Sequence, residues 1–148
     1  MKKIISGAFV FIMVIGNNDV TAQIRKIPAA VTQSFKVKFP EVAEVEWKDK
    51  LTVFEASYEV DAIKYQSTFN NKGEWKKTET EIAEEDLPSE VQEGLDKSKY
   101  KSWEIKTVSN VQTIEGQKFM LVVQKSALQK KRLYFSYDGQ LIKDPITF

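Results

Sequence analysis

Residues 27–35 read Ile-Pro-Ala-Ala-Val-Thr-Gln-Ser-Phe, and residues 87–95 read Leu-Pro-Ser-Glu-Val-Gln-Glu-Gly-Leu. The proline and the apolar positions coincide when the second stretch is moved back by sixty residues. A fixed internal period is typical of a protein built from copies of one supersecondary unit that pack against each other. The sequence therefore predicts two copies of one structural unit.

A second correspondence lies further along each copy, at an offset of sixty-six residues. The matching patterns are Phe69-x3-Gly73-x-Trp75 and Phe135-x3-Gly139-x-Leu141. The six additional residues fall between Val123 and Leu133, which predicts a longer middle hairpin in the second copy.

Each copy is predicted to begin with a helix. Apolar side chains recur every four residues in the first copy, and they form one stripe on a helix: Ile27, Val31, Phe35 and Phe39. Pro28 suits the first helical turn, and Pro40 ends the helix because the residue before a proline favours extended backbone. We expect helices over residues 28–39 and 88–98.

Four strands are predicted after each helix, because apolar and polar side chains alternate there. The expected strands lie near 45–47, 53–60, 63–69 and 74–80, and near 103–113, 117–124, 131–137 and 140–143. Asn70 to Gly73, Glu115-Gly116 and Asp138-Gly139 are typical hairpin turns. The predicted fold class is α+β: two tandem helix-plus-four-strand antiparallel repeats, with both helices on one face of the sheet and the other face open to solvent.

Residues 1–22 are predicted to be a secretory signal peptide. Lys2 and Lys3 precede the apolar run 4–15, and Val20-Thr21-Ala22 supplies small residues for cleavage. The run is shorter than the ~20 residues that a membrane span requires. We expect a signal peptide (1–22), repeat one (23–82) and repeat two (83–148), with the repeats forming one compact unit. The protein is then periplasmic or extracellular, with no membrane span after cleavage.

Composition excludes several function classes. The chain after residue 22 carries 20 basic and 20 acidic side chains, whereas nucleic-acid binding usually needs a basic excess. It has no histidine and no cysteine, so Ser–His and Cys–His catalysis are impossible. The acidic cluster at the junction between the copies lacks calcium-loop spacing and is typical of a helix N-terminus: Glu81, Glu84, Glu85 and Asp86. We predict no catalytic residue, no metal and no cofactor.

The sheet face opposite the helices is the candidate binding surface. Repeat one is expected to present only polar side chains there: Glu55, Ser57, Glu59, Lys64, Gln66, Thr68, Lys76, Thr78 and Thr80. Repeat two is expected to present an apolar patch among charges: Val108, Met120, Val122 and Tyr134 among Lys106, Lys118 and Arg132. Exposed apolar patches often mark interaction sites, although a shifted strand phase would bury these side chains instead.

The predicted partner-binding set has three parts. Met120, Val122 and Tyr134 form its apolar centre, Lys118 and Arg132 form its rim, and Trp75 is a further candidate aromatic after a turn. The basic run 125–132 has two interpretations, a soluble hairpin that resists edge pairing or a contact for an anionic partner or lipid headgroup.

Several motifs together resemble one known family. They are Phe39-Pro40-x6-Trp47, Tyr58-Glu59-Val60, the run from Gly73 to Ile82, and Leu87-Pro88-x2-Val91. They are similar to the PepSY-like, β-lactamase-inhibitor-like family of secreted bacterial proteins. The resemblance implies a tandem fold with a curved sheet, a location in the periplasm or outside the cell, and a non-enzymatic binding or inhibitory role.

Three functions of different classes remain open from the sequence. The leading hypothesis is a binding module that engages an unidentified protein partner through the open sheet face. The second is binding of a small molecule, peptide or glycan in the sheet concavity, with Trp75 taking part. A structural envelope protein is the third, and a carboxylate-based hydrolase is disfavoured by the missing histidine and cysteine.

Overall fold

The structure is a computed structural model that describes residues 25–142, so the predicted signal peptide and the end of the last predicted strand, Lys143, lie outside the described residues. The elements, in chain order, are α1 (Ala29–Lys38), β1 (Glu46–Asp49), β2 (Val53–Val60), β3 (Ile63–Asn70), β4 (Trp75–Ile82), the 3-10 helix η1 (Glu84–Asp86), α2 (Ser89–Asp96), β5 (Glu104–Thr113), β6 (Gly116–Ser126), β7 (Gln129–Ser136) and β8 (Leu141–Ile142). One helix followed by four strands thus occurs twice. We call α1 to β4 the N-terminal half and η1 to β8 the C-terminal half.

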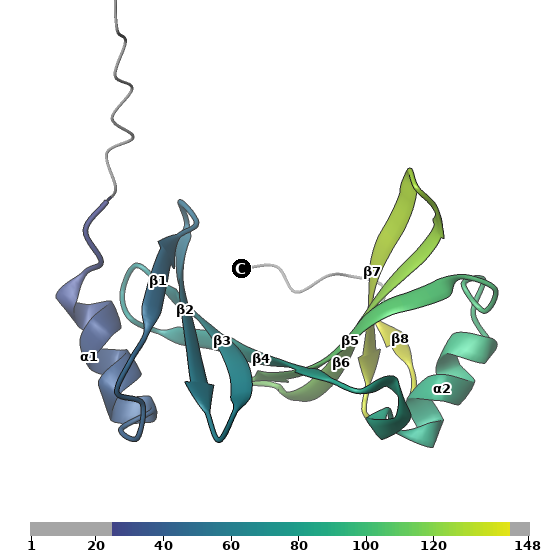
Figure 1. Cartoon of the computed structure of the whole chain (residues 1–148), viewed down its shortest axis with the longest axis horizontal. Coiled ribbons are helices and arrows are strands. Elements are labelled where there is room, and N and C mark those ends of the chain that lie inside the picture. Colours follow the sequence, from purple (N-terminus) through teal and green to yellow (C-terminus); the bar gives the residue numbers. More distant parts are fainter. Residues whose placement is uncertain (1–24, 143–148) are drawn as a thin grey trace, which may run out of the picture.

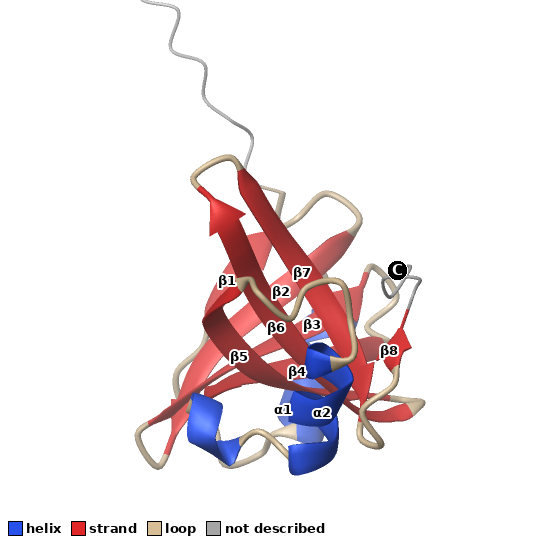
Figure 2. Ribbon diagram, turned by 90° about the vertical axis from the view of Figure 1, so that its right-hand side faces the viewer, coloured by secondary structure: helices blue, strands red, loops and turns tan. Residues whose placement is uncertain are grey.

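All eight strands form one antiparallel sheet in the order of the sequence, and the β4–β5 pair joins the two halves. The sheet is strongly curved, and α1 and α2 lie at opposite ends on its convex side (Figure 1). Figure 2 shows both helices on the same side of the twisted sheet. The predicted α+β class, with its helices on one face of a curved antiparallel sheet, is confirmed. Neither helix in the described part of the chain has the length and apolarity needed to cross a membrane.

The convex face carries two separate cores, one under each helix. The core under α1 is mostly aromatic and is built from Val31, Phe35, Phe54, Ala56, Tyr58 and Phe69. The core under α2 is mostly aliphatic and is built from Leu87, Val91, Leu95, Val108, Phe119, Leu121, Val123, Leu133 and Phe135. Each helix therefore covers the strands of its own half, as the apolar stripes predict.

Two glycines let the β3–β4 and β7–β8 turns press against the helices. Gly73 has φ of 82° and Gly139 has φ of 80°, in the left-handed region that favours glycine. A Cβ atom at Gly73 would lie 2.5 Å from the carbonyl oxygen of Ala30 in α1. A Cβ atom at Gly139 would overlap the carbonyl oxygen of Glu90 in α2. The recurring glycine thus fixes the distance between helix and sheet in both halves.

Two strands differ in phase from the sequence prediction. Thr78 and Thr80 of β4 lie on the convex face, because Thr78 pairs with Ser67 and Thr80 with Tyr65. The sequence placed these threonines on the open face. A register shift at Thr68/Phe69, where β3 pairs with β4, moves the alternation by one residue.

Val108 of β5 is the second correction. It pairs with Leu121, is 2% exposed and belongs to the core under α2, whereas the sequence placed it in the open apolar patch. A register shift between Ile105 and Thr107 lets both Ile105 and Val108 pack against that core. An alternation count that assumes an uninterrupted strand cannot reproduce this arrangement.

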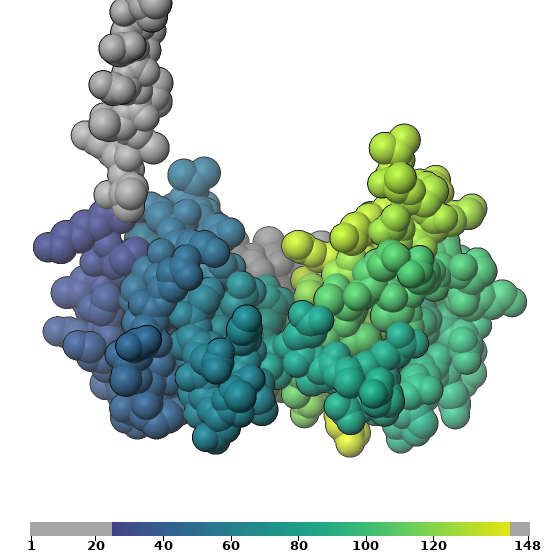
Figure 3. Space-filling model, in the orientation of Figure 1, coloured from purple at the N-terminus to yellow at the C-terminus, as the bar shows by residue number. Residues whose placement is uncertain are grey.

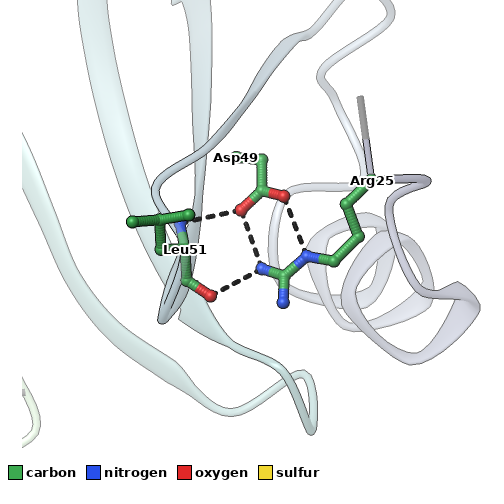
Figure 4. Close-up of polar contacts among 3 residues, drawn as sticks. All are labelled: Arg25, Asp49 and Leu51. Atoms are coloured by element: carbon green, nitrogen blue, oxygen red, sulfur yellow. Dashed lines mark hydrogen bonds and ion pairs between the residues drawn. The ribbon is translucent and has the colours of Figure 1, made fainter. Parts of the chain in front are cut away.

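An ion pair ties the chain before α1 to the β1–β2 turn. The Arg25 guanidinium donates from Nε and Nη2 to the two carboxylate oxygens of Asp49 at 2.8 and 2.7 Å, and from Nη2 to the Leu51 carbonyl oxygen (Figure 4). The bond to Arg25 is the main cause that holds the pKa of Asp49 below its usual 3.8. Asp49 also accepts a hydrogen bond from the Leu51 N–H, which fixes the turn.

Candidate functional site

The concave side of the sheet forms a groove of about 1390 Å³. Strands β1 and β2 rise on one side of it, and the β6–β7 hairpin rises on the other (Figure 3). The residues that line this concave groove are Glu41, Ala43, Glu44, Val45, Glu46, Lys50, Glu55, Ser57, Tyr58, Glu59, Lys64, Tyr65, Gln66, Lys77, Glu79, Glu81, Ser109, Met120 and Arg132. The groove lies on the face of the sheet that the helices leave free (Figure 1).

Five of the six predicted partner-binding residues come together on this face. Met120 pairs directly with Tyr134, and Val122 pairs directly with Arg132. Lys118 lies two positions before Met120 on the same face of β6, because side chains two residues apart in a strand point the same way. The three apolar or aromatic side chains are half-buried. The strands thus place one apolar group, defined here as Met120, Val122 and Tyr134, beside two cations.

Of the two cations beside this apolar group, Lys118 is paired with a carboxylate. Lys118 Nζ lies 2.6 Å from a carboxylate oxygen of Glu115, so its charge has a partner within the same hairpin. Burial raises the pKa of the Tyr134 phenol, and the negative charge of Glu79 raises it further, whereas Arg132 opposes the rise. Tyr134 is therefore neutral at physiological pH and can donate a hydrogen bond to a ligand.

The wall of the groove formed by the N-terminal half is acidic. The lining holds seven glutamates and four basic side chains. Two of the four cations already pair with groove carboxylates, Lys77 with Glu79 at 2.8 Å and Lys50 with Glu55 at 3.8 Å. The remaining carboxylates lie before β1, at the start of β1, and near the ends of β2 and β4: Glu41, Glu44, Glu46, Glu59 and Glu81.

Trp75, the sixth predicted residue, does not lie in the groove. Its ring packs against the core under α1, and Lys38 Nζ of α1 lies 3.9 Å from the ring centroid. Its Nε1 donates to Thr78 Oγ1 at 2.9 Å. This arrangement occupies both the face and the polar atom of Trp75 on the convex side, so the tryptophan is not part of the concave surface.

Sequence reasoning missed Glu79 and Glu81 as groove residues. It expected Lys76, Thr78 and Thr80 of β4 on the open face, and the shifted phase of that strand places Lys77, Glu79 and Glu81 there instead. Alternation of polar and apolar residues was the only sequence signal for the faces of β4, and alternation does not reveal a β-bulge.

Three of the four acidic residues at the junction form η1, whereas Glu81 lies in β4. Glu84, Glu85 and Asp86 are all exposed on this 3-10 helix, directly before α2. Within residues 25–142, no group of three or more Asp, Glu, His or Cys side chains is arranged to hold a metal ion.

Comparison with known proteins gives one family match. The sequence model of the family described as "Putative beta-lactamase-inhibitor-like, PepSY-like" matches residues 56–143. That range covers more than half of the chain and contains β3 to β8 and most of β2. No curated protein sequence matches the chain.

Solved structures from Bacteroides species share the fold. A crystal structure described as "putative periplasmic proteins" from Bacteroides eggerthii is 20% identical, with a TM-score of 0.68 over 80% of this chain and 87% of that chain. A DUF2874 family protein from Bacteroides ovatus is 22% identical, with a TM-score of 0.70 over 80% and 86%. A BLIP-like protein from Bacteroides fragilis is 24% identical, with a TM-score of 0.66 over 79% and 84%. These likenesses establish a common fold.

Proposed function

Because the chain belongs to the PepSY-like, beta-lactamase-inhibitor-like family, we propose that it is a non-catalytic binding module that engages a protein partner through the concave groove. The observation that carries the proposal is the apolar group Met120, Val122 and Tyr134, half-buried on the free face of the sheet beside Lys118 and Arg132. Protein interfaces commonly have an apolar centre with a polar rim. The absence of histidine and cysteine from the sequence supports a role without nucleophilic catalysis.

The site of action in this proposal is the periplasm or the cell exterior. Residues 1–22 have the sequence pattern of a signal peptide, and one solved structure of the same fold is described as periplasmic. An inhibitory role is the more specific version of the proposal. It is supported by the family description and by the BLIP-like neighbour, and it requires the partner to be an enzyme.

The two halves are, in this proposal, tandem repeats of one binding scaffold. Support comes from the sixty-residue offset between the helices and from the turns that carry Gly73 and Gly139. In both turns the glycine N–H donates to the carbonyl oxygen three residues earlier at 3.0 Å. The residues that a Cβ would meet, Ala30 and Glu90, are themselves sixty residues apart.

The test is affinity capture from a cell-envelope extract with the purified protein and its Met120→Asp/Tyr134→Asp variant. The double variant places two carboxylates in the apolar group and should release a partner that the native protein retains. Val37→Asp is the matched control, because Val37 is 83% exposed on α1 and lies away from the groove. Circular dichroism and thermal unfolding confirm that all three proteins are folded.

A partner retained by the native protein and by Val37→Asp, but lost with the double variant, supports the proposal. Equal retention by all three proteins removes the apolar group from the interface. Inhibition is then measured directly, as loss of the captured enzyme's activity on titration with native protein but not with the double variant.

A second candidate is binding of a polar ligand such as a glycan or an extended peptide. The groove floor favours it, because Ser57, Gln66 and Ser109 supply hydrogen-bonding side chains there. Calorimetric titration with envelope glycans distinguishes this candidate, since it predicts saturable binding in the absence of any protein partner.

A further inference from the structure

The outer part of the β6–β7 hairpin is a cationic arm. From Gly116 to Ser136 the chain carries five basic residues and no acidic one. Four of these cations lie near the tip, are exposed, and form no ion pair with another described residue: Lys125, Lys130, Lys131 and Arg132. We call residues 125–132 the cationic arm.

An apolar side chain stands at the tip of this arm. Leu128 is 96% exposed, more than any other large hydrophobic side chain of the described residues. It lies in the turn between β6 and β7, at the end that projects furthest from the sheet (Figure 1). Burial of this leucine at a contact would remove its apolar surface from water, which favours association.

The concave groove offers complementary chemistry. Glu41, Glu44, Glu59 and Glu81 line it without forming an ion pair with another described residue. Apolar contacts are available beside them at Val45 and on the floor at Met120. A hairpin that carries unpaired cations and one leucine therefore matches the groove in charge and in apolar content.

The cationic arm cannot fill its own groove, because it forms one wall of it (Figures 1 and 3). A two-fold axis can place the arm of a second copy at the open side of the first groove. The same rotation brings the first arm to the second groove. Such an isologous arrangement closes on itself and makes both contacts at once.

We propose that a second copy of this chain occupies the concave groove, with the cationic arm of each protomer inserted against the carboxylates of the other. The balanced charge of the chain after residue 22 is consistent with this association, because a net charge near zero does not oppose contact between copies. The inference goes beyond the proposed function and shares with it the groove, including Met120 and Arg132. A protein partner would have to displace the second copy, so the dimer masks the binding surface.

The test is sedimentation velocity of the purified protein over a concentration series. We expect a monomer–dimer equilibrium whose dissociation constant rises at least tenfold between about 0.1 M and about 1 M NaCl, because the screening length falls from roughly 10 Å to roughly 3 Å. A native protein that stays monomeric throughout the series overturns the inference. A dimer whose dissociation constant does not change with salt overturns the electrostatic contact between arm and groove.

Charge reversal locates the interface. Lys125→Glu/Lys130→Glu changes only the arm, and Glu44→Lys/Glu59→Lys changes only the groove wall; all four side chains are exposed. Each variant alone should be monomeric, because like charges then meet in both contacts. An equimolar mixture should form a heterodimer, since each reversed surface meets a complementary one. Glu84→Lys/Glu85→Lys on η1 is the matched control and should remain dimeric.

The outcomes separate this inference from the proposed function. Dimers that persist in both reversal variants, or a mixture that fails to associate, overturn the arm-in-groove contact. Leu128→Ser should weaken the native dimer about tenfold through lost apolar contact, and an unchanged dissociation constant contradicts the insertion of the tip. Partner capture is scored separately with Met120→Asp/Tyr134→Asp, so either idea can fail while the other survives.

Discussion

Phe35 of α1 and Leu95 of α2 occupy corresponding positions, sixty residues apart, yet they meet different surroundings. The Phe35 ring lies 5.2 to 6.1 Å from the rings of Phe39, Trp47, Tyr58 and Phe69. Leu95 instead packs in a core built mainly from leucine and valine. Aromatic rings gain from edge-to-face contacts as well as from burial, whereas aliphatic side chains gain from burial and close packing.

The difference extends to polar atoms. In the N-terminal half the Tyr58 hydroxyl lies 3.0 Å from Ser67 Oγ, which lies 2.7 Å from Thr78 Oγ1. Val123 and Leu133 of the C-terminal core lie at the strand positions that correspond to Tyr58 and Ser67. One scaffold therefore accepts either a hydrogen-bonded aromatic core or an aliphatic core, provided that the helix-to-turn distance is kept.

Replacing either turn glycine by alanine should cause the largest loss in the free energy of unfolding. The loss should be similar in the two halves. Gly139→Ala introduces a methyl group into the Glu90 carbonyl oxygen and also strains the backbone, so we expect a loss of about 4 kcal/mol in the free energy of unfolding. Gly73→Ala should cost a similar amount against Ala30. Urea denaturation measures both.

Gly116→Ala is the control for backbone strain without a clash, because φ there is 123° and nothing lies within 4 Å of the place that the added methyl group would take. Its cost should be smaller by at least about 1 kcal/mol. Equal losses in the free energy of unfolding for Gly116→Ala and Gly139→Ala would show that the contact of Gly139 with α2 contributes nothing to stability.

Alanine at Phe35 and at Leu95, the corresponding residues of the two helices, compares the stability that each core supplies. Phe35→Ala should lower the free energy of unfolding by about 4 kcal/mol, and Leu95→Ala by about 3 kcal/mol, because both leave cavities and the phenyl ring is larger. Denaturation monitored by tryptophan fluorescence and by circular dichroism gives both values. A larger loss for Leu95→Ala would contradict the view that the aromatic cluster supplies the more valuable contacts.

Ser67→Ala tests the polar network that only the N-terminal half contains. It removes a buried hydroxyl that bonds both Tyr58 and Thr78, and Thr78 keeps only its bond from Trp75, so we expect a loss of about 2 kcal/mol. Burial raises the Tyr58 pKa above 10.0, and the bond to Ser67 opposes the rise. The variant should therefore shift the Tyr58 titration to higher pH in an ultraviolet absorbance titration.

The sign of the pH dependence follows from the raised pKa. The folded protein holds the Tyr58 proton more tightly than the unfolded chain, so its stability is full below pH 10.0 and falls as pH rises toward the folded pKa. Tyr58→Phe should flatten this alkaline loss. An alkaline slope that is unchanged in Tyr58→Phe would assign the loss to other groups.

The smallest loss of stability is expected at the Arg25–Asp49 ion pair. No ion pair among the described residues ties the chain before α2 to a strand in the same way. The pair lies at the surface, where solvent screens it, so Arg25→Ala should destabilise the protein only slightly. Asp49 has a depressed pKa, and its contribution is therefore present above pH 3.8 and disappears as pH falls through the folded pKa. The difference between native protein and Arg25→Ala, measured by thermal unfolding, should shrink from pH 7 to pH 3.

Most of the fold was predictable because helix and strand periods differ and the turns carry glycine. The predicted helix over residues 28–39 corresponds to α1, Ala29–Lys38, and the strand predicted at 53–60 corresponds to β2, Val53–Val60. The five concave residues on β6 and β7 were also placed correctly, because these strands alternate without interruption between Lys118 and Gln124.

The rest depended on contacts that alternation does not encode. Register shifts in β3–β4 and β5–β6 moved Thr78 and Val108 to the convex face, and the cost of each shift is set by distant neighbours. Trp75 was a candidate for the binding set, but it lies on the convex side because it pairs with Phe69 and packs against the core under α1. Glu41 and Glu44, in the segment before β1, line the groove because the whole sheet is curved, and strand alternation does not predict that curvature.

The order of the sheet has a consequence for how the chain folds. Every strand pairs only with the strand that precedes or follows it, so sheet formation requires no pairing of strands remote in sequence. Closing short loops costs little entropy, and proteins with such local contacts fold quickly for their size. The first four strands can therefore assemble on α1 while the rest of the chain is still emerging from a ribosome.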